Sequence, residues 1–192
     1  MLTELDVDAA DVLACFDTGL VALTLAARRP DRVRSLVLAH CYATYARRPD
    51  YPYGLDAGAA AQLIHDTVSP RPAQERIETA FQVAASAGHD DAFRRWWTRI
   101  GQRGAGPRTA ATIRRIATTS DVRPRLRDVT APTLVLHRRS CLNLDVGHAH
   151  YLAEHLPHAE LAVVPGTDPL WFTDTPHLLD RAVAFLEAGG AR

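Results

Sequence analysis

The chain has 192 residues, of which 47% are hydrophobic, and its 22 basic and 22 acidic side chains give a formal net charge of +0. This composition suits a compact globular domain, and no apolar run reaches the length that spans a membrane. Because no basic stripe is present, neither nucleic acid nor an anionic membrane surface is favoured as a partner. All the basic residues are arginine, which excludes Schiff-base chemistry through lysine.

The chain begins with an apolar run around 11–15 that predicts a buried strand, and a small, apolar helix follows over 20–29. The turn between them, 14–18, has the small-x-nucleophile-x-small frame of a nucleophile elbow, with Phe16 at the central position. Pro30 ends the helix, and 33–38 predicts a second short buried strand. The sequence therefore predicts strand, elbow, helix and strand, with phenylalanine where a nucleophile would stand.

This arrangement resembles the α/β-hydrolase family, in particular a branch linked to nucleotide cyclase or transcription-regulator domains. In that branch a serine elbow leads through a helix to a Pro-Glu/Asp-Arg-x-Arg-x-Leu-Val-Leu run, which matches 30–38 here. Further runs resemble the same branch in the same order, at 48–54, 93–99, 121–123 and 131–138. The resemblance implies a partial α/β-hydrolase fold of the α/β class. Its mostly parallel sheet would have about four strands, around 11–15, 33–38, 132–137 and 160–164, with a helical cap insertion.

The resemblance also implies a division of the chain. Residues 1–55 and 120–192 would form the core, and 56–119 would form the cap. Gly and Pro positions predict the cap helices at 57–68, 72–87, 90–102 and 107–119.

Complete family members place several strands before the elbow, so the first half of the sheet would be absent, and residues 1–11 look like the end of a preceding helix and its turn. The strand near 11–15 would then be an edge with unpaired backbone groups, which invites another chain. We therefore predict a homodimer, or a partner chain bound at this edge.

Three positions correspond to the catalytic triad of the family, and none holds the expected residue. Phe16 takes the place of the nucleophile, Cys141 that of the acid, and Pro169 that of the histidine base. Because the triad works as a unit, these losses predict that hydrolysis by the family mechanism does not occur. An alternative is a one-residue slip that puts Asp17 at the elbow, as in haloalkane dehalogenases and epoxide hydrolases, but the base would still be missing.

The three cysteines, Cys15, Cys41 and Cys141, are an odd number without repeated spacing, and no signal segment opens the chain. A cytoplasmic location is expected, with the cysteines packed as small hydrophobic side chains. The alternative is that Cys15 and Cys141 line the ancestral cavity and that one of these two acts as a nucleophile. The histidines between 148 and 158 have offsets that scatter around a helix, so neither a metal site nor a cofactor is predicted.

The function predicted from these losses is that of a catalytically degenerate, non-hydrolytic protein that binds a hydrophobic small molecule or a partner chain. The alternative is a repurposed lyase, isomerase or cyclase of bacterial specialised metabolism, in which Asp17, His40 or Asp168 moves protons. The expected pocket is apolar and lies between the elbow and the cap. It would be lined by Cys15, Phe16, Asp17, His40, Cys41, Phe81, Trp96, Trp97, Cys141, His148, Pro169 and Trp171.

Overall fold

A computed structural model describes residues 7–69, 89–103, 106–170 and 176–189 of the chain. In these ranges four strands form one parallel sheet in the order β1-β2-β3-β4. The strands are β1 (Ala10–Cys15), β2 (Val33–Ala39), β3 (Thr133–Arg138) and β4 (Ala159–Val164). The predicted α/β class, with a parallel sheet of four strands, is confirmed.

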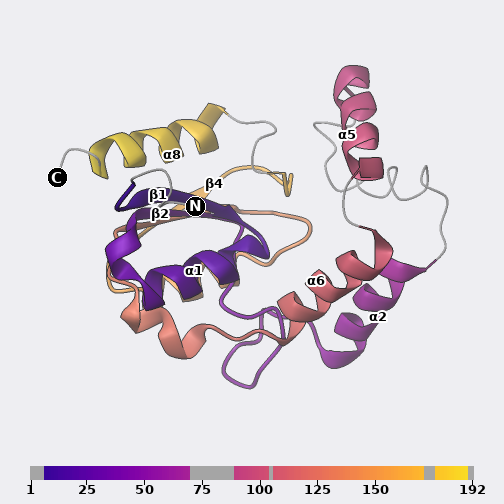
Figure 1. Ribbon diagram of the computed structural model, residues 1–192, viewed down its shortest axis with the longest axis horizontal. Coiled ribbons are helices and arrows are strands. Elements are labelled where there is room, and N and C mark those ends of the chain that lie inside the picture. Colours follow the sequence, from indigo (N-terminus) through magenta and orange to yellow (C-terminus); the bar gives the residue numbers. More distant parts are fainter. Residues whose placement is uncertain (1–6, 70–88, 104–105, 171–175, 190–192) are drawn as a thin grey trace.

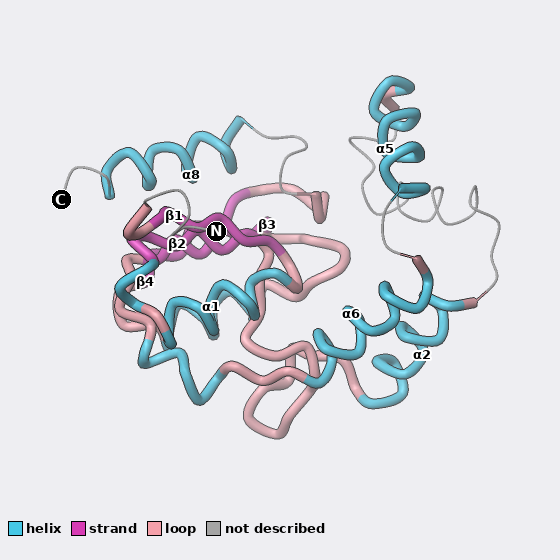
Figure 2. Tube along the Cα trace, in the orientation of Figure 1, coloured by secondary structure: helices cyan, strands magenta, loops and turns pink. Residues whose placement is uncertain are grey.

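The helices alternate with the strands, as parallel pairing requires. The helices of the described ranges are α1 (Thr18–Arg28), α2 (Ala57–Val68), α5 (Asp91–Arg103), α6 (Pro107–Thr119), α7 (Gly147–His155) and α8 (Pro176–Gly189), with 3-10 turns η2 (Pro30–Arg32) and η3 (Arg123–Asp128). Figure 2 shows α1 and α8 on opposite sides of the sheet.

Both faces of the sheet are covered, because successive side chains of a strand point to opposite faces. On one face Leu36 and Leu38 of β2 join the larger core with residues of α1, η3 and α7. On the other face Val37 and Ala39 pack with Leu178 of α8. All four of these β2 side chains are fully buried, so β2 forms the centre of the molecule.

The start of β1 corrects one expectation. Residues 1–6 lie outside the described residues, but Ala10 and Asp11 belong to the strand and do not form a turn before it. Asp11 is held there because its carboxylate accepts from the Ser35 hydroxyl at 2.7 Å and from the Arg34 guanidinium at 3.2 Å. Among the described strands β1 is at one edge of the sheet, which leaves the predicted homodimer or partner chain as a prediction.

Between β2 and β3 the chain forms the helices of the predicted cap region. Helices α2 and α6 pack against each other beside the core, and α5 stands apart from both in Figure 1. The predicted helix at 72–87 lies outside the described residues, and the division at 56–119 stays a prediction. In the part of the chain that the structure describes, no helix combines the length and apolarity needed to cross a membrane.

Candidate active site at the carboxyl edge of the sheet

The elbow joins β1 to α1 through a strained residue. Phe16 has φ +48°, in the left-handed region that bulky side chains rarely adopt, whereas Asp17 has φ −56° and stands at the N-cap position of α1 without a side-chain capping bond. Gly19 allows the close approach of helix and loop, since a Cβ there would lie 2.6 Å from the Cys41 Sγ. The geometry thus puts Phe16 at the elbow position and contradicts the one-residue slip that would put Asp17 there.

Under the elbow lies a pair of buried histidines. The Phe16 ring stacks on His40 at 5.7 Å between centroids, and His40 meets His137 edge-on at 4.9 Å. His40 Nε2 accepts the backbone N–H of Arg138 at 3.2 Å, which leaves its proton on Nδ1. Burial lowers the pKa of His40 to about 3 and also lowers that of His137, so both rings are neutral at physiological pH. His40, a predicted proton carrier, is therefore fully buried beneath Phe16 and has no access to a substrate.

A polar cluster forms beside the elbow around the carboxylate of Asp17. One oxygen, Oδ1, accepts from the Tyr42 hydroxyl, and the other, Oδ2, accepts from Arg114 Nη1 at 3.2 Å. Tyr42 follows β2, and Arg114 belongs to α6 in the predicted cap region, so three distant segments meet at one side chain. Burial, and then the charge of Asp17, raise the pKa of Tyr42, which keeps its hydroxyl protonated as a donor. Sequence reasoning proposed Asp17 but missed both of its partners.

The loops after β3 and β4 contact each other. Arg138 is 1% exposed, and its Nη1 donates to the backbone carbonyls of Asp168 at 2.7 Å and Leu170 at 2.8 Å. The Arg138 side chain, called the strap below, thus joins the two loops. Asp168, the predicted proton carrier, and Pro169, the predicted base position, are buried beside it. Cys141, at the predicted acid position, is half-buried, and burial raises the pKa of its thiol. The strap therefore leaves neither loop with an ionised group that is open to solvent at these positions.

Of the remaining cysteines, Cys41 is structural. Cys41 is 1% exposed, its Sγ donates to the carbonyl of Ala14 at 3.4 Å, and burial raises its pKa well above the ordinary value. Cys15 is half-buried at the end of β1. The structure thus agrees with packing of Cys41 in the core and offers no activated thiolate there.

His148 is a buried residue of the core. It is buried among tyrosines, and its Nδ1 lies 2.5 Å from the hydroxyl of Tyr51, which is itself fully buried. Burial lowers the pKa of His148 to about 4, against the opposing effect of Asp145. This histidine therefore fixes the loop after β2 onto α7 as a neutral ring, and it lies within the core rather than on a pocket wall.

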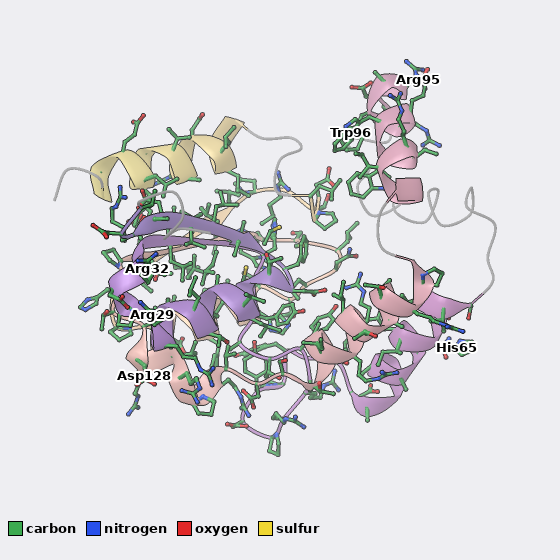
Figure 3. All side chains as sticks on the ribbon, in the orientation of Figure 1. Arg29, Arg32, His65, Arg95, Trp96 and Asp128 are labelled. Atoms are coloured by element: carbon green, nitrogen blue, oxygen red, sulfur yellow. The ribbon has the colours of Figure 1, made fainter. Side chains whose placement is uncertain are left out.

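The predicted aromatic walls are not brought to the elbow. Phe81 and Trp171 lie outside the described residues. Trp96 and Trp97 are on α5, where their ring contacts in the described ranges are with each other and with Phe93, and Figure 3 shows Trp96 far from the sheet. A cavity of about 270 Å³ lies elsewhere, between α8 and the start of β4, with Glu160 and Arg181 at its wall.

The chain is similar to known hydrolases in sequence and in fold. It is 30% identical over 150 residues to a pimeloyl-[acyl-carrier protein] methyl ester esterase of Nitrosomonas europaea, which covers 77% of this chain and 59% of that relative. A bromoperoxidase of Bacillus anthracis has a TM-score of 0.82 at 20% identity, covering 97% of this chain and 70% of the other. An esterase of Exiguobacterium antarcticum has a TM-score of 0.76 at 21% identity, with coverage of 97% and 67%. No family model matches.

These likenesses support the α/β-hydrolase superfamily, and the fold is that of the α/β hydrolases. The chain spans about three fifths of the length of the Nitrosomonas relative. No comparison supports the predicted branch linked to nucleotide cyclases.

The predicted function is corrected by the same relatives. The sequence relatives are named as pimeloyl-[acyl-carrier protein] methyl ester esterases, which contradicts a non-hydrolytic binding protein as well as a lyase, isomerase or cyclase. The prediction failed because it equated the loss of one triad with the loss of hydrolysis, although an acid–base group at the same edge of the sheet can also activate water.

Proposed function

We propose that this chain is a hydrolase of carboxylic esters, and that Asp17 activates the attacking water. The observation that carries the proposal is the carboxylate of Asp17 at the first turn of α1, fixed by the Tyr42 hydroxyl and by Arg114. It lies at the carboxyl ends of parallel strands, the edge where open α/β sheets bind ligands. The esterase relatives support the same class of reaction.

The proposed reaction needs no covalent intermediate. A water donates a hydrogen bond to the Asp17 carboxylate, which takes the proton as the water oxygen bonds to the ester carbonyl carbon. The positive end of the α1 dipole lies at this turn and stabilises the negative charge that develops on the carbonyl oxygen. As the bond from carbon to the alkoxide oxygen breaks, Asp17 returns the same proton to the alkoxide. Acid and alcohol leave, and the carboxylate is regenerated.

Tyr42 and Arg114 have positioning roles in this scheme. The Tyr42 hydroxyl occupies one oxygen of Asp17, so the carboxylate has a fixed orientation while the other oxygen faces α6. The Asp17 side chain is 24% exposed, which permits access by water, whereas His40 is fully buried. Asp17 therefore combines access with orientation, and the losses inferred at Phe16, Cys141 and Pro169 do not bear on it.

The test is hydrolysis of p-nitrophenyl acetate by the purified protein and by Asp17→Asn, prepared in parallel. General-base catalysis contributes about 10²–10⁴-fold, so we expect kcat/KM to fall by about a hundredfold or more. Asp31→Asn is the matched control, because Asp31 also pairs with an arginine, Arg29, but is exposed at the opposite end of α1. Equal rates for wild type and Asp17→Asn would refute the proposal, since the activity would then belong to another group or to a contaminant.

A further inference from the structure

We propose that Arg114 binds the free carboxylate of an anionic ester, and that this carboxylate replaces Asp17 on the guanidinium. The inference rests on the proposed hydrolysis at Asp17 and adds the class of substrate. It starts from the ion pair between Arg114 and Asp17, which joins the cap region to the elbow.

This ion pair is loose. A single N–H of Arg114 reaches Asp17, at 3.2 Å, beyond the usual 2.7–2.9 Å of charge-assisted bonds. By contrast, two guanidinium nitrogens of Arg29 donate to the carboxylate of Asp31 at 3.0 and 2.7 Å. Two guanidinium nitrogens of Arg123 donate to the carboxylate of Asp121 at 2.8 to 3.1 Å. The Arg114 guanidinium therefore keeps most of its five donors for another acceptor.

The Arg114 side chain is accessible from solvent. Its side chain is 42% exposed, and within the described ranges the only acceptor that it meets is Asp17. A carboxylate that arrives from solvent can form the two parallel bonds that a guanidinium favours, which the resting contact does not provide. The exchange is therefore favourable for an anion and has no equivalent for a neutral ester.

The exchange also has a consequence for the reaction. While Arg114 occupies Oδ2 and Tyr42 occupies Oδ1, both oxygens of Asp17 are engaged. When a substrate carboxylate takes over the guanidinium, Oδ2 becomes free to accept the hydrogen bond of water. An anionic ester is thus held next to Asp17 and frees Oδ2 of the base, whereas a neutral ester reaches the base only when the ion pair between Arg114 and Asp17 opens by itself and is hydrolysed more slowly.

The direct test compares monomethyl succinate with methyl butyrate, two methyl esters of similar length that differ in the free carboxylate. For wild type we expect kcat/KM for monomethyl succinate to be about tenfold or more above that for methyl butyrate. In Arg114→Gln this ratio falls to about one. Arg115→Gln is the matched control, because residue 115 is exposed on the same helix but points to a different side, and it keeps the ratio of wild type. An unchanged ratio in Arg114→Gln would overturn the inference.

A second measurement does not depend on turnover. Titration calorimetry with succinate is expected to detect binding to wild type and to Arg115→Gln, and a loss of affinity of about tenfold or more in Arg114→Gln. This result together with absent hydrolysis would sustain the carboxylate site and refute Asp17 as the base. Equal succinate binding by Arg114→Gln, or no binding by wild type, would refute the carboxylate site whatever the rate of hydrolysis.

Discussion

Acidification should lower the free energy of unfolding at pH values well above those at which carboxylates titrate. The reason is that the folded protein buries neutral histidines. The pKa values of His40 and His148 are lowered to about 3 and about 4, mainly by burial, and that of His137 is lowered as well. In the unfolded chain a histidine titrates near 6.5. Below that pH these histidines are protonated in the unfolded state but stay neutral in the folded state, so the free energy of unfolding falls as the pH falls.

The size of the effect follows from the lowered pKa values of His40 and His148. Between about pH 7.5 and pH 5, His40 and His148 should each remove about 2 kcal/mol from the free energy of unfolding. A loss of about 4 kcal/mol is a large part of the 5–15 kcal/mol that stabilises a typical domain. Asp50 and Asp121, whose pKa values are lowered, titrate below this window and do not mask it.

The assay is urea unfolding followed by tryptophan fluorescence at several pH values, with His148→Gln as the perturbation. The variant is expected to be less stable at pH 7.5, because Tyr51 loses its partner, but its further loss down to pH 5 should be about 2 kcal/mol smaller than that of wild type. His65→Gln is the control, since the His65 side chain is 71% exposed, and should behave as wild type. Identical pH dependence in His148→Gln and wild type would refute the assignment of His148 as a buried neutral ring.

Two further predictions test packing and assembly. Gly54→Ala should lower the free energy of unfolding by about 1–3 kcal/mol, because the new Cβ would lie 2.5 Å from the backbone of Ala46. Gly106→Ala is the control, since its Cβ meets nothing within 4 Å, and it should change that free energy by less than about 1 kcal/mol. Equal urea midpoints for the two variants would contradict the close approach at Gly54. If β1 pairs with a second copy of the chain, light scattering should give twice the mass of the chain. Leu13, whose side chain is 38% exposed, lies on this edge strand, and Leu13→Lys should shift the protein toward the monomer. A monomeric wild type at micromolar concentration would contradict this edge as the interface.

Most of the fold could be predicted from local patterns. The apolar runs predicted β1 and β2, and the resemblance to the family predicted β3 and β4, each to within a residue or two. The Gly and Pro positions predicted α2 and α6 at the observed bounds. These signals are strong because a parallel strand that is buried on both faces must be a continuous apolar run. The start of β1 was missed because Asp11 looks like a turn residue. Its place in the strand depends on Ser35 and Arg34, which are distant in sequence.

The site was predictable only in part, for a similar reason. The elbow frame located Phe16 and Asp17, and the strand ends located His40, Cys141 and Asp168. Whether such a residue is exposed, buried or paired depends on tertiary contacts that leave no local pattern. His40 is withdrawn beneath a ring, and Asp168 is buried under the strap from Arg138. Likewise nothing in the sequence of α6 distinguishes Arg114 from the other arginines of the cap region.

The persistence of the elbow with phenylalanine explains why Asp17 is well placed for chemistry. A bulky residue in the left-handed region costs roughly 1–3 kcal/mol, so the conformation must be imposed by its surroundings. Here the Phe16 N–H donates to Ala39, its carbonyl accepts from Gly19, and its ring stacks on His40. These contacts fix the direction in which α1 begins, and hence the position of the next side chain. The strained turn would thus hold the proposed base, Asp17, at the edge of the sheet, just as the same turn would hold a nucleophile there. Relief of the strain by Phe16→Gly should then loosen the start of α1 and lower the activity that depends on Asp17, even though Phe16 itself takes no part in the proposed reaction.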